Sequence, residues 1–358
     1  MIIVDAHQDI AYNAVCFGRD YLQSALRKRQ LETSTDIPAQ AGIATLGLPE
    51  AIAGRVAVVF ATLFVAPRSP RPAPWKNVMY DDISGAYRLA LQQMDTYQRL
   101  ADDSGQIRLI RSHVDLDAVL ATWGEDKTVK DRQQGLVILM ENADPIIEPR
   151  QFEEWYERGV RIVGPAWQAS RYSAGTGAPG PLTPLGRELL EVMANFNAIL
   201  DLSHMAEIAF LEALDRYTGT VIASHSNPRH FCDTDRHLTD AMIRRLAERN
   251  GVMGVVMLNS FLDGKWSKTD TKKAVTFSTV VDIIDYVCQL TGSAAYVGLG
   301  SDFDGGFGAE SIPAEIDTTA DLWYLRKALV QRGYNEDDIT AILGGNMLRK
   351  LREALPAR

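Results

Sequence analysis

The chain has 358 residues, of which 46% are hydrophobic and 23% charged, and its formal net charge is −9. This composition supplies a large core and excludes a disordered chain, and an acidic balance without a Lys/Arg run argues against a nucleic-acid partner. No apolar run reaches the roughly 18 residues of a membrane span, and the first apolar run begins at Ile2 and leaves no room for a signal peptide, so we expect a soluble, cytoplasmic protein.

Eight apolar runs that stop at polar residues are predicted as strands. They cover residues 2–4, 55–65, 135–140, 160–163, 198–202, 220–223, 252–258 and 296–299. A shorter run at 107–110 is either a ninth strand or part of an excursion. Helical periodicity between the runs is clearest at 187–197, at 238–251, where Thr239 is the expected N-cap and Asn250-Gly251 the stop, and at 278–292.

Alternating strands and helices predict parallel strands joined by crossover helices. Eight such units close a (β/α)8 TIM barrel, an α/β fold, and we expect one domain over residues 1–358. A doubly wound open sheet is the alternative. Two long loops, at 66–75 after the second strand and 170–181 after the fourth, fall on the C-terminal face, where barrel enzymes keep their sites.

Several strands end in groups that can bind a metal. In "IIVDAHQDIAY", period-two alternation puts Asp5, His7 and Asp9 on one face. Two further histidines of the six, His204 and His225, also follow apolar runs. Glu141 and Asp302 follow two others, and in a closed barrel all these ends surround one mouth.

Nitrogen and oxygen ligands suit zinc, with manganese or iron as alternatives, and three cysteines without C-x-x-C spacing argue against a thiolate site. Because the groups exceed the needs of one ion, we expect two metals bridged by Glu141. His7 and Asp9 would hold one ion, and His204 and His225 the other. Such a pair lowers the pKa of a bridging water and makes a hydroxide nucleophile.

Other polar residues receive narrower expectations. Asp302 is the candidate to move the proton from the nucleophile to the leaving amine, and Arg236 can grip a substrate carboxylate. Asp5 lies deeper and is expected to support the ligands rather than to bind metal. His230 and His237 are expected in a solvated loop.

The segments "DAHQD", "MEN", "DLSH", "SHSNPRHFCDTDRHLTD", "GSDFDG" and "GGNMLRKLREAL" occur in this order. Together they resemble the membrane (renal-type) dipeptidase family of dinuclear zinc peptidases, over nearly the whole chain. The resemblance implies a distorted barrel of the amidohydrolase type. It also implies hydrolysis of dipeptides, often with tolerance for a D-residue at the C-terminal position. The resemblance further implies a homodimer.

Position by position, the resemblance assigns His7, Asp9, Glu141, His204 and His225 as zinc ligands. It assigns Asp302 to proton transfer and Arg236 to the substrate's C-terminal part, and it loosely matches Phe261 to a substrate-contacting tyrosine. One position departs from the pattern. Where the mammalian-type motif has a histidine after the fourth strand, thought to stabilise the tetrahedral intermediate, this chain has Trp167, followed by Gln168.

The sequence therefore predicts a zinc dipeptidase that acts on small dipeptides and contacts no membrane. The departure at Trp167 keeps two alternatives open, because loss of one oxyanion donor typically costs about 10²–10³ in kcat. One is a related metal-dependent amidohydrolase acting on another small amide or lactam. The other is a catalytically impaired homologue. Gln168, or His230 from its loop, is the candidate replacement donor.

Overall fold

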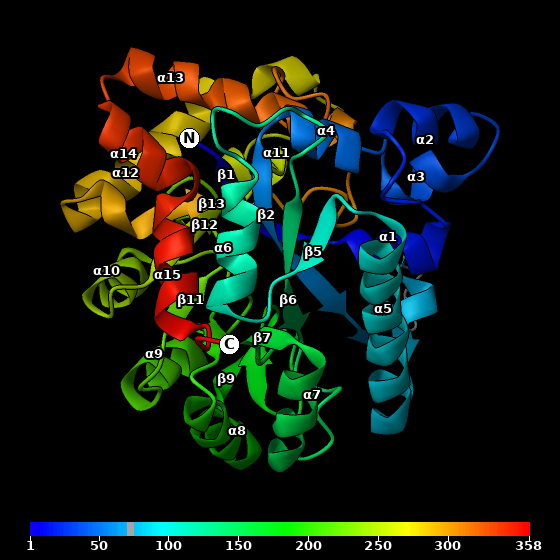
Figure 1. Ribbon diagram of the computed structural model, residues 1–358. Coiled ribbons are helices and arrows are strands. Elements are labelled where there is room, and N and C mark those ends of the chain that lie inside the picture. The colour runs from blue at the N-terminus through cyan, green and yellow to red at the C-terminus, as the bar shows by residue number, and fades with distance from the viewer. Residues whose placement is uncertain (70–74) are drawn as a thin grey trace.

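A closed parallel barrel forms the centre of the computed structural model, which describes residues 1–69 and 75–358. Its strands, in order around the ring, are β1 (Ile3–Gln8), β2 (Val56–Phe64), β6 (Gln134–Glu141), β7 (Val160–Gly164), β10 (Ile199–Asp201), β11 (Val221–Ala223), β12 (Val252–Val255) and β13 (Val297–Leu299). All eight coincide with the predicted runs, and the predicted α/β barrel is confirmed (Figure 1).

Two pairings decide between a barrel and an open sheet. β2 pairs along its length with β6, from Val58 opposite Gly135 to Phe64 opposite Glu141, and β1 pairs with β13 through Asp5 and Leu299. The ring therefore has no free edge, and the doubly wound alternative is wrong. The run at 107–110 forms a ninth strand, β5 (Ile107–Leu109), which adds to the start of β6 outside the ring.

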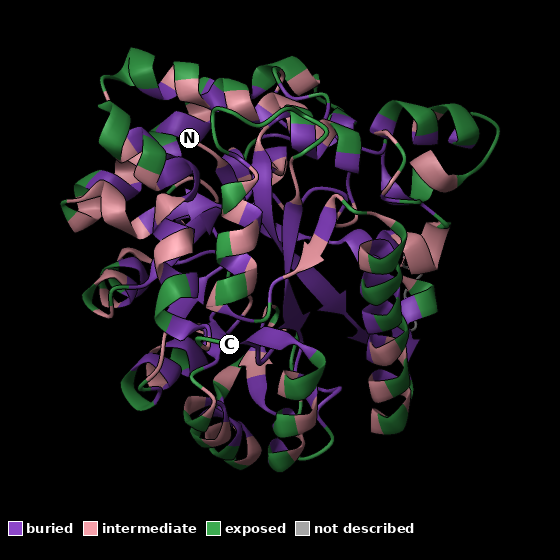
Figure 2. Cartoon of the chain, viewed as in Figure 1, coloured by how far each residue is buried: buried purple, intermediate pink, exposed green. Residues whose placement is uncertain are grey.

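Helices surround the barrel, and the strands between them are almost entirely buried (Figures 1 and 2). Those of the described residues are α1 (Ile10–Phe17), α2 (Ala25–Glu32), α3 (Ile37–Ala41), α4 (Leu48–Ala53), α5 (Ile83–Asp103), α6 (His113–Ala121), α7 (Phe152–Arg158), α8 (Pro184–Asn195), α9 (Glu207–Arg216), α10 (Asp240–Glu248), α11 (Asn259–Leu262), α12 (Phe277–Thr291), α13 (Leu325–Arg332), α14 (Glu336–Thr340) and α15 (Asn346–Ala354). No helix was predicted over residues 10–53, where α1 to α4 lie.

The predicted helix boundaries hold to within a few residues. The Thr239 side chain accepts the backbone N–H of Met242 and caps α10 as expected, and the helix ends just before Asn250, whose φ is 54°. α8 starts three residues earlier than predicted, because Thr183 caps it and Pro184 occupies its first turn. α12 begins at Phe277, next to the predicted start.

The two predicted loops differ from simple connections. Residues 170–181 contain an antiparallel hairpin, β8 (Ser173–Gly175) and β9 (Ala178–Leu182). In the other loop, β3 (Ala66–Pro67) pairs with β4 (Met79–Tyr80), and residues 70–74 lie outside the described residues. Both segments follow strands at their carboxyl ends, so they border the mouth of the barrel.

Candidate metal centre and active site

The six groups predicted to bind metal or move a proton lie together at the mouth of the barrel. His7 lies near the end of β1, with Asp9 just beyond, and Glu141 is the last residue of β6. His204 and His225 follow β10 and β11, and Asp302 follows β13. Their ligand atoms form three overlapping groups, each within 4.8 Å: His7–Asp9–Glu141, Glu141–His204–His225, and His7–His225–Asp302.

Glu141 lies between two of these groups. Its Oε1 is 3.2 Å from His204 Nε2 and 3.4 Å from His225 Nε2, whereas its Oε2 is 3.5 Å from His7 Nε2. One carboxylate thus presents a different oxygen to each side. This is the arrangement that a bridging ligand between two ions requires.

The spacing of these atoms fits a metal ion. His204 Nε2 and His225 Nε2 are 3.1 Å apart, and ligands about 2.0–2.1 Å from a tetrahedral ion lie about 3.3 Å from each other. His7 Nε2 is buried and has no hydrogen-bond partner among the described residues. A buried ring nitrogen without a partner, facing carboxylates, is suited to coordinate a cation.

The electrostatics of the cluster favour positive charge. Burial lowers the pKa of His7, but the surrounding carboxylates, with Glu141 foremost, outweigh burial and raise it to about 10. Burial raises the pKa of Asp9 to about 6 and that of Asp302 well above its usual range. A site that stabilises positive charge this strongly is suited to a divalent cation.

The other two imidazoles are held neutral, the form that binds metal. Burial, with the charge of Arg236, lowers the pKa of His204 to about 4. Burial and the charge of His7 hold the pKa of His225 well below its usual range.

A second layer of polar residues, which was not predicted from the sequence, orients the candidate ligands. Ser224 Oγ lies 2.7 Å from His225 Nδ1 and 3.5 Å from His7 Nδ1, and it donates to the carboxylate of Asp201. Thr176 Oγ1, in the hairpin, lies 3.1 Å from His204 Nδ1. Such partners fix the ring orientation and tautomer of ligating histidines. Asp201, in "DLSH", lies at the end of β10 and could have been noticed in the sequence. Its contact with Ser224 could not, because Ser224 follows a different strand, β11.

Asp5 supports the site from below. Its carboxylate accepts the backbone N–H of Ser301 at 2.7 Å and the side-chain amide of Gln8 at 2.7 Å. It therefore holds the segment that carries Asp302 and, as expected, lies outside the three ligand groups.

Residues that follow strands at this mouth have unusual backbone conformations. Asn142, His204, Asp302 and Asp304 all have φ between 59° and 74°, the left-handed region that non-glycine residues rarely adopt. Such conformations cost of order 1–3 kcal/mol each and concentrate at functional sites. Here they aim the side chains of His204 and Asp302 into the mouth.

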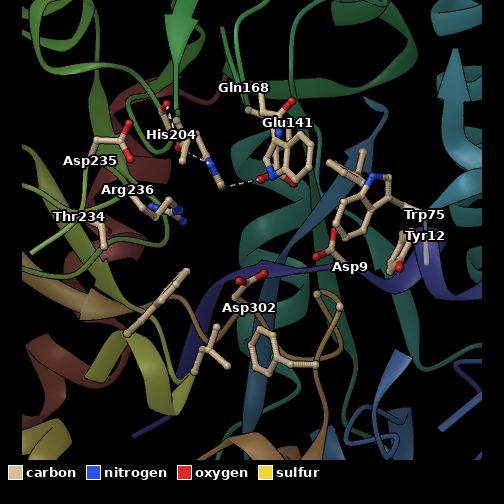
Figure 3. Close-up of a pocket in the computed structure, with 18 residues that line it drawn as sticks. Asp9, Tyr12, Trp75, Glu141, Gln168, His204, Thr234, Asp235, Arg236 and Asp302 are labelled. Carbon is tan, nitrogen blue, oxygen red and sulfur yellow. Dashed lines mark hydrogen bonds and ion pairs between the residues drawn. The ribbon is translucent and has the colours of Figure 1, made fainter. Parts of the chain in front are cut away.

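A pocket of about 430 Å³ opens above this cluster (Figure 3). Asp9, Glu141, His204 and Asp302 contribute to its lining. The remaining lining residues are Tyr12, Phe64, Trp75, Trp167, Gln168, Thr176, Thr234, Asp235, Arg236, Leu258, Phe261, Gly305, Gly306 and Phe307. Its volume suits a small molecule.

Arg236 places a buried positive charge at one side of the pocket. The residue is 6% exposed, and its Nη2 donates to the backbone oxygen of His225 at 2.7 Å. Its guanidinium lies 5.7 Å from the ring centre of Phe261. In the described chain no carboxylate forms an ion pair with it. A buried guanidinium without an anionic partner is suited to a substrate carboxylate.

The remaining predicted residues have mixed outcomes. Trp167, Gln168 and Phe261 line the pocket. His230 is not one of the lining residues: it is exposed and stacks on Tyr286, with ring centres 4.6 Å apart. The expected solvated position of His237 is wrong. Its ring is fully buried, because it packs edge-on against Phe261 with ring centres 4.7 Å apart.

The family model "Membrane dipeptidase (Peptidase family M19)" matches residues 1–357. The chain belongs to the membrane dipeptidase family. This confirms the sequence-based resemblance, and the chain is accordingly a hydrolase of a metallo-dipeptidase family whose substrates are small peptides.

Individual relatives agree with this membership. An uncharacterized protein encoded in the pqqA 5′ region of Klebsiella pneumoniae is 33% identical over 71% of this chain and 92% of its own length. The solved structure of a family M19 dipeptidase matches with a TM-score of 0.79 at 22% identity, covering 99% of both chains. A Rhodobacter sphaeroides metallopeptidase, liganded with a phosphinate mimic of L-Ala-D-Ala, matches with a TM-score of 0.78 at 21% identity, again covering 99% of both. These structures share the fold of this membrane dipeptidase family member. Among the described residues, no helix combines the length and the hydropathy needed to cross a bilayer.

Proposed function

We propose that this chain is a zinc-dependent dipeptidase with two ions per chain, one held by His7 and Asp9 and the other by His204 and His225. Glu141 would contribute to holding both. The observation that carries the proposal is Glu141, whose two oxygens face different imidazoles at the floor of the pocket. When bound, the ions supply an activated water as nucleophile and polarise the scissile carbonyl.

The chain's own residues bind and orient the dipeptide. Arg236 pairs with its C-terminal carboxylate, because the guanidinium is buried and lacks a carboxylate partner among the described residues. Phe261 packs beside that guanidinium and keeps water from the ion pair. This contact places the C-terminal residue on the Arg236 side and the peptide carbonyl above Glu141 and His204, which orients it for attack.

Asp302 moves the proton. Its Oδ1 is 3.9 Å from His7 Nε2, and it lines the pocket with a side chain that is 15% exposed. It takes the proton released by the nucleophile and gives it to the nitrogen of the leaving residue. The positive charge of two ions beside it would keep this carboxylate ionised and able to accept the proton.

Hydrolysis of dipeptides by the zinc-reconstituted protein tests the proposal. We expect release of both amino acids from L-Xaa-L-Xaa substrates and from L-Xaa-D-Xaa substrates such as L-Ala-D-Ala, a mimic of which is bound in the Rhodobacter sphaeroides structure. Because Arg236 recognises a carboxylate, amidation of the C-terminus should lower kcat/KM by at least 100-fold. A protein that cleaves amidated and free dipeptides equally well contradicts the role of Arg236.

One observation favours a second candidate, a related amidohydrolase that acts on an N-acyl amino acid or lactam. Trp167 and Gln168 line the pocket beside His204, and among the described residues no other histidine lines it. The indole can donate only through its N–H, so the oxyanion has a weaker donor than an imidazolium. If N-acyl amino acids are hydrolysed faster than dipeptides with the same C-terminal residue, this second function replaces the first.

A further inference from the structure

Four aromatic residues form one side of the pocket, which we call the aromatic wall: Tyr12, Phe64, Trp75 and Trp167. Their rings meet edge to face. The ring centres are 5.8 Å apart for Tyr12 and Phe64, 5.1 Å for Phe64 and Trp167, and 5.4 Å for Trp75 and Trp167. These are the distances and angles at which aromatic pairs stabilise each other. The wall is therefore a fixed surface rather than a set of loose side chains.

The aromatic wall has a buried back and an accessible front. All four residues line the pocket, but Tyr12 is 2% and Phe64 7% exposed, whereas Trp75 and Trp167 are half-buried. Tyr12, Phe64 and Trp167 come from α1, β2 and the segment after β7, so their positions depend on the barrel itself, whereas Trp75 stands in the loop between β3 and β4. The ring centre of Trp167 is 6.2 Å from that of His204, which brings the wall next to the metal centre.

Two of the four residues of the aromatic wall, Tyr12 and Trp75, lie across the pocket from Arg236, and Trp167 lies between them and His204. In Figure 3, Tyr12 and Trp75 lie beside Asp9, whereas Arg236 and Thr234 lie across the cavity, beyond Glu141. A dipeptide that pairs its carboxylate with Arg236 and presents its carbonyl at the metal centre has one direction left for its first residue. That direction leads to the wall.

We propose that the aromatic wall is the subsite for the side chain of the N-terminal residue, and that it selects dipeptides whose first residue is large and apolar. This inference rests on the proposed dipeptidase function. Packing an apolar side chain against these rings is favourable because it removes apolar surface from water. A charged or hydroxylated side chain would instead lose its hydration without gaining a hydrogen-bond partner there. In an apolar pocket each methylene group changes kcat/KM by roughly 10–200-fold.

A dipeptide series with one constant C-terminal residue tests the inference. With zinc-loaded protein we expect kcat/KM to rise at least tenfold from Gly-Ala to Leu-Ala and Phe-Ala. Ser-Ala and Asp-Ala should not exceed Gly-Ala. Equal values across the series overturn the inference but leave the dipeptidase function intact. Hydrolysis of none of these dipeptides overturns the function, and the inference with it.

Alanine variants test whether the aromatic wall causes the preference for a large apolar first residue. Trp167→Ala and Trp75→Ala should each lower the Phe-Ala to Gly-Ala ratio of kcat/KM by about tenfold, mostly through the Phe substrate. Trp323→Ala removes a half-buried indole that does not line the pocket, and it should leave the ratio unchanged. If the Trp323→Ala variant changes the ratio as much as the other two, the aromatic wall is not the specificity subsite.

A binding measurement separates recognition from turnover. Phosphinic dipeptide analogues with a benzyl or a methyl group in the N-terminal position should differ at least tenfold in inhibition constant with the wild-type protein. The difference should fall towards unity in Trp167→Ala. Equal inhibition constants for the two analogues in the wild-type protein overturn the inference, whatever the rates of hydrolysis.

Discussion

At the scale of single residues, Glu141 has the most demanding position. Its Oε1 faces His204 and His225 and its Oε2 faces His7, so no shorter or neutral side chain can serve both sides. We expect Glu141→Ala to lose bound zinc and to lower kcat by more than the roughly 10–100-fold that loss of an outer partner of a metal ligand typically costs.

Metal analysis after gel filtration, together with dipeptide turnover, checks this prediction. Wild-type protein should retain close to two equivalents of zinc per chain. Glu248→Ala is the matched control, because its carboxylate lies on α10 and is 60% exposed, and this variant should retain both zinc and activity. If Glu141→Ala keeps both ions, the carboxylate is structural and the bridge is wrong.

Because the ring of His237 is buried, its protonation should make the free energy of unfolding depend on pH. Burial, with the charges of Arg236 and Arg229, lowers the pKa of His237 to about 3 from its ordinary value of 6.5. Between these two values the unfolded chain binds a proton that the folded chain does not. The free energy of unfolding therefore decreases as the pH falls below about 6.5, by up to about 1.4 kcal/mol per pH unit from this residue.

Urea unfolding at pH 7 and pH 5 measures this effect. Both ring nitrogens of His237 lack hydrogen-bond partners among the described residues, so His237→Leu should be tolerated at pH 7. The variant should lose about 2 kcal/mol less than the wild type between the two pH values. An identical loss in both proteins would show that His237 takes up its proton in the folded state as well.

At the scale of elements, α1 joins the loops that carry Asp9 and Asp302. Asn13 Nδ2 donates to the backbone oxygens of Asp9 and Asp304, both at 2.9 Å. Arg19 Nη1 donates to Asn13 Oδ1 at 3.0 Å, and Arg19 also pairs with Glu32 at the end of α2. The segment from α1 to α2 is thus part of the support of the site and not only a connection between β1 and β2.

Breaking this support should cost stability. The side chains of Arg19 and Glu32 are only 2% and 6% exposed, and removing one partner of a buried pair costs about 3–5 kcal/mol because the other charge is left unpaired. We therefore expect Arg19→Ala to lower the free energy of unfolding, measured in urea, by that amount. Arg245→Ala breaks pairs whose partners, Asp215 and Glu248, are about 60% exposed, and it should cost less than about 1 kcal/mol. Equal losses would contradict the role of the Arg19 pair.

At the scale of the whole molecule, the barrel was predictable because each strand carries its own local signal. Eight apolar runs sufficed, and the meeting of the candidate ligands His7, Glu141, His204 and His225 followed from the rule that parallel strands end at one mouth. Positions that depend on tertiary contacts were not predictable. Ser224 contacts His7 and Asp201 across strands, and His237 lies in a polar sequence yet packs on Phe261. The homodimer, the single domain and the cytoplasmic location stay predictions.

The arrangement of the candidate ligands around the barrel leads to one further expectation, on metal removal. His7, Glu141, His204 and His225 come from four different strands, β1, β6, β10 and β11, or the turns that follow them. A ligand that binds the folded chain alone stabilises it by about 2.7 kcal/mol when its free concentration is 100 times its Kd. Chelation should therefore lower the Tm by at least several degrees. Differential scanning calorimetry of zinc-loaded and chelated protein measures this shift.

Asp302→Asn is the informative control. If Asp302 moves protons and binds no ion, this variant should lose turnover but keep the zinc-dependent rise in Tm. If the variant loses both turnover and the zinc-dependent rise in Tm, Asp302 is a metal ligand, and its proposed role in proton transfer is contradicted.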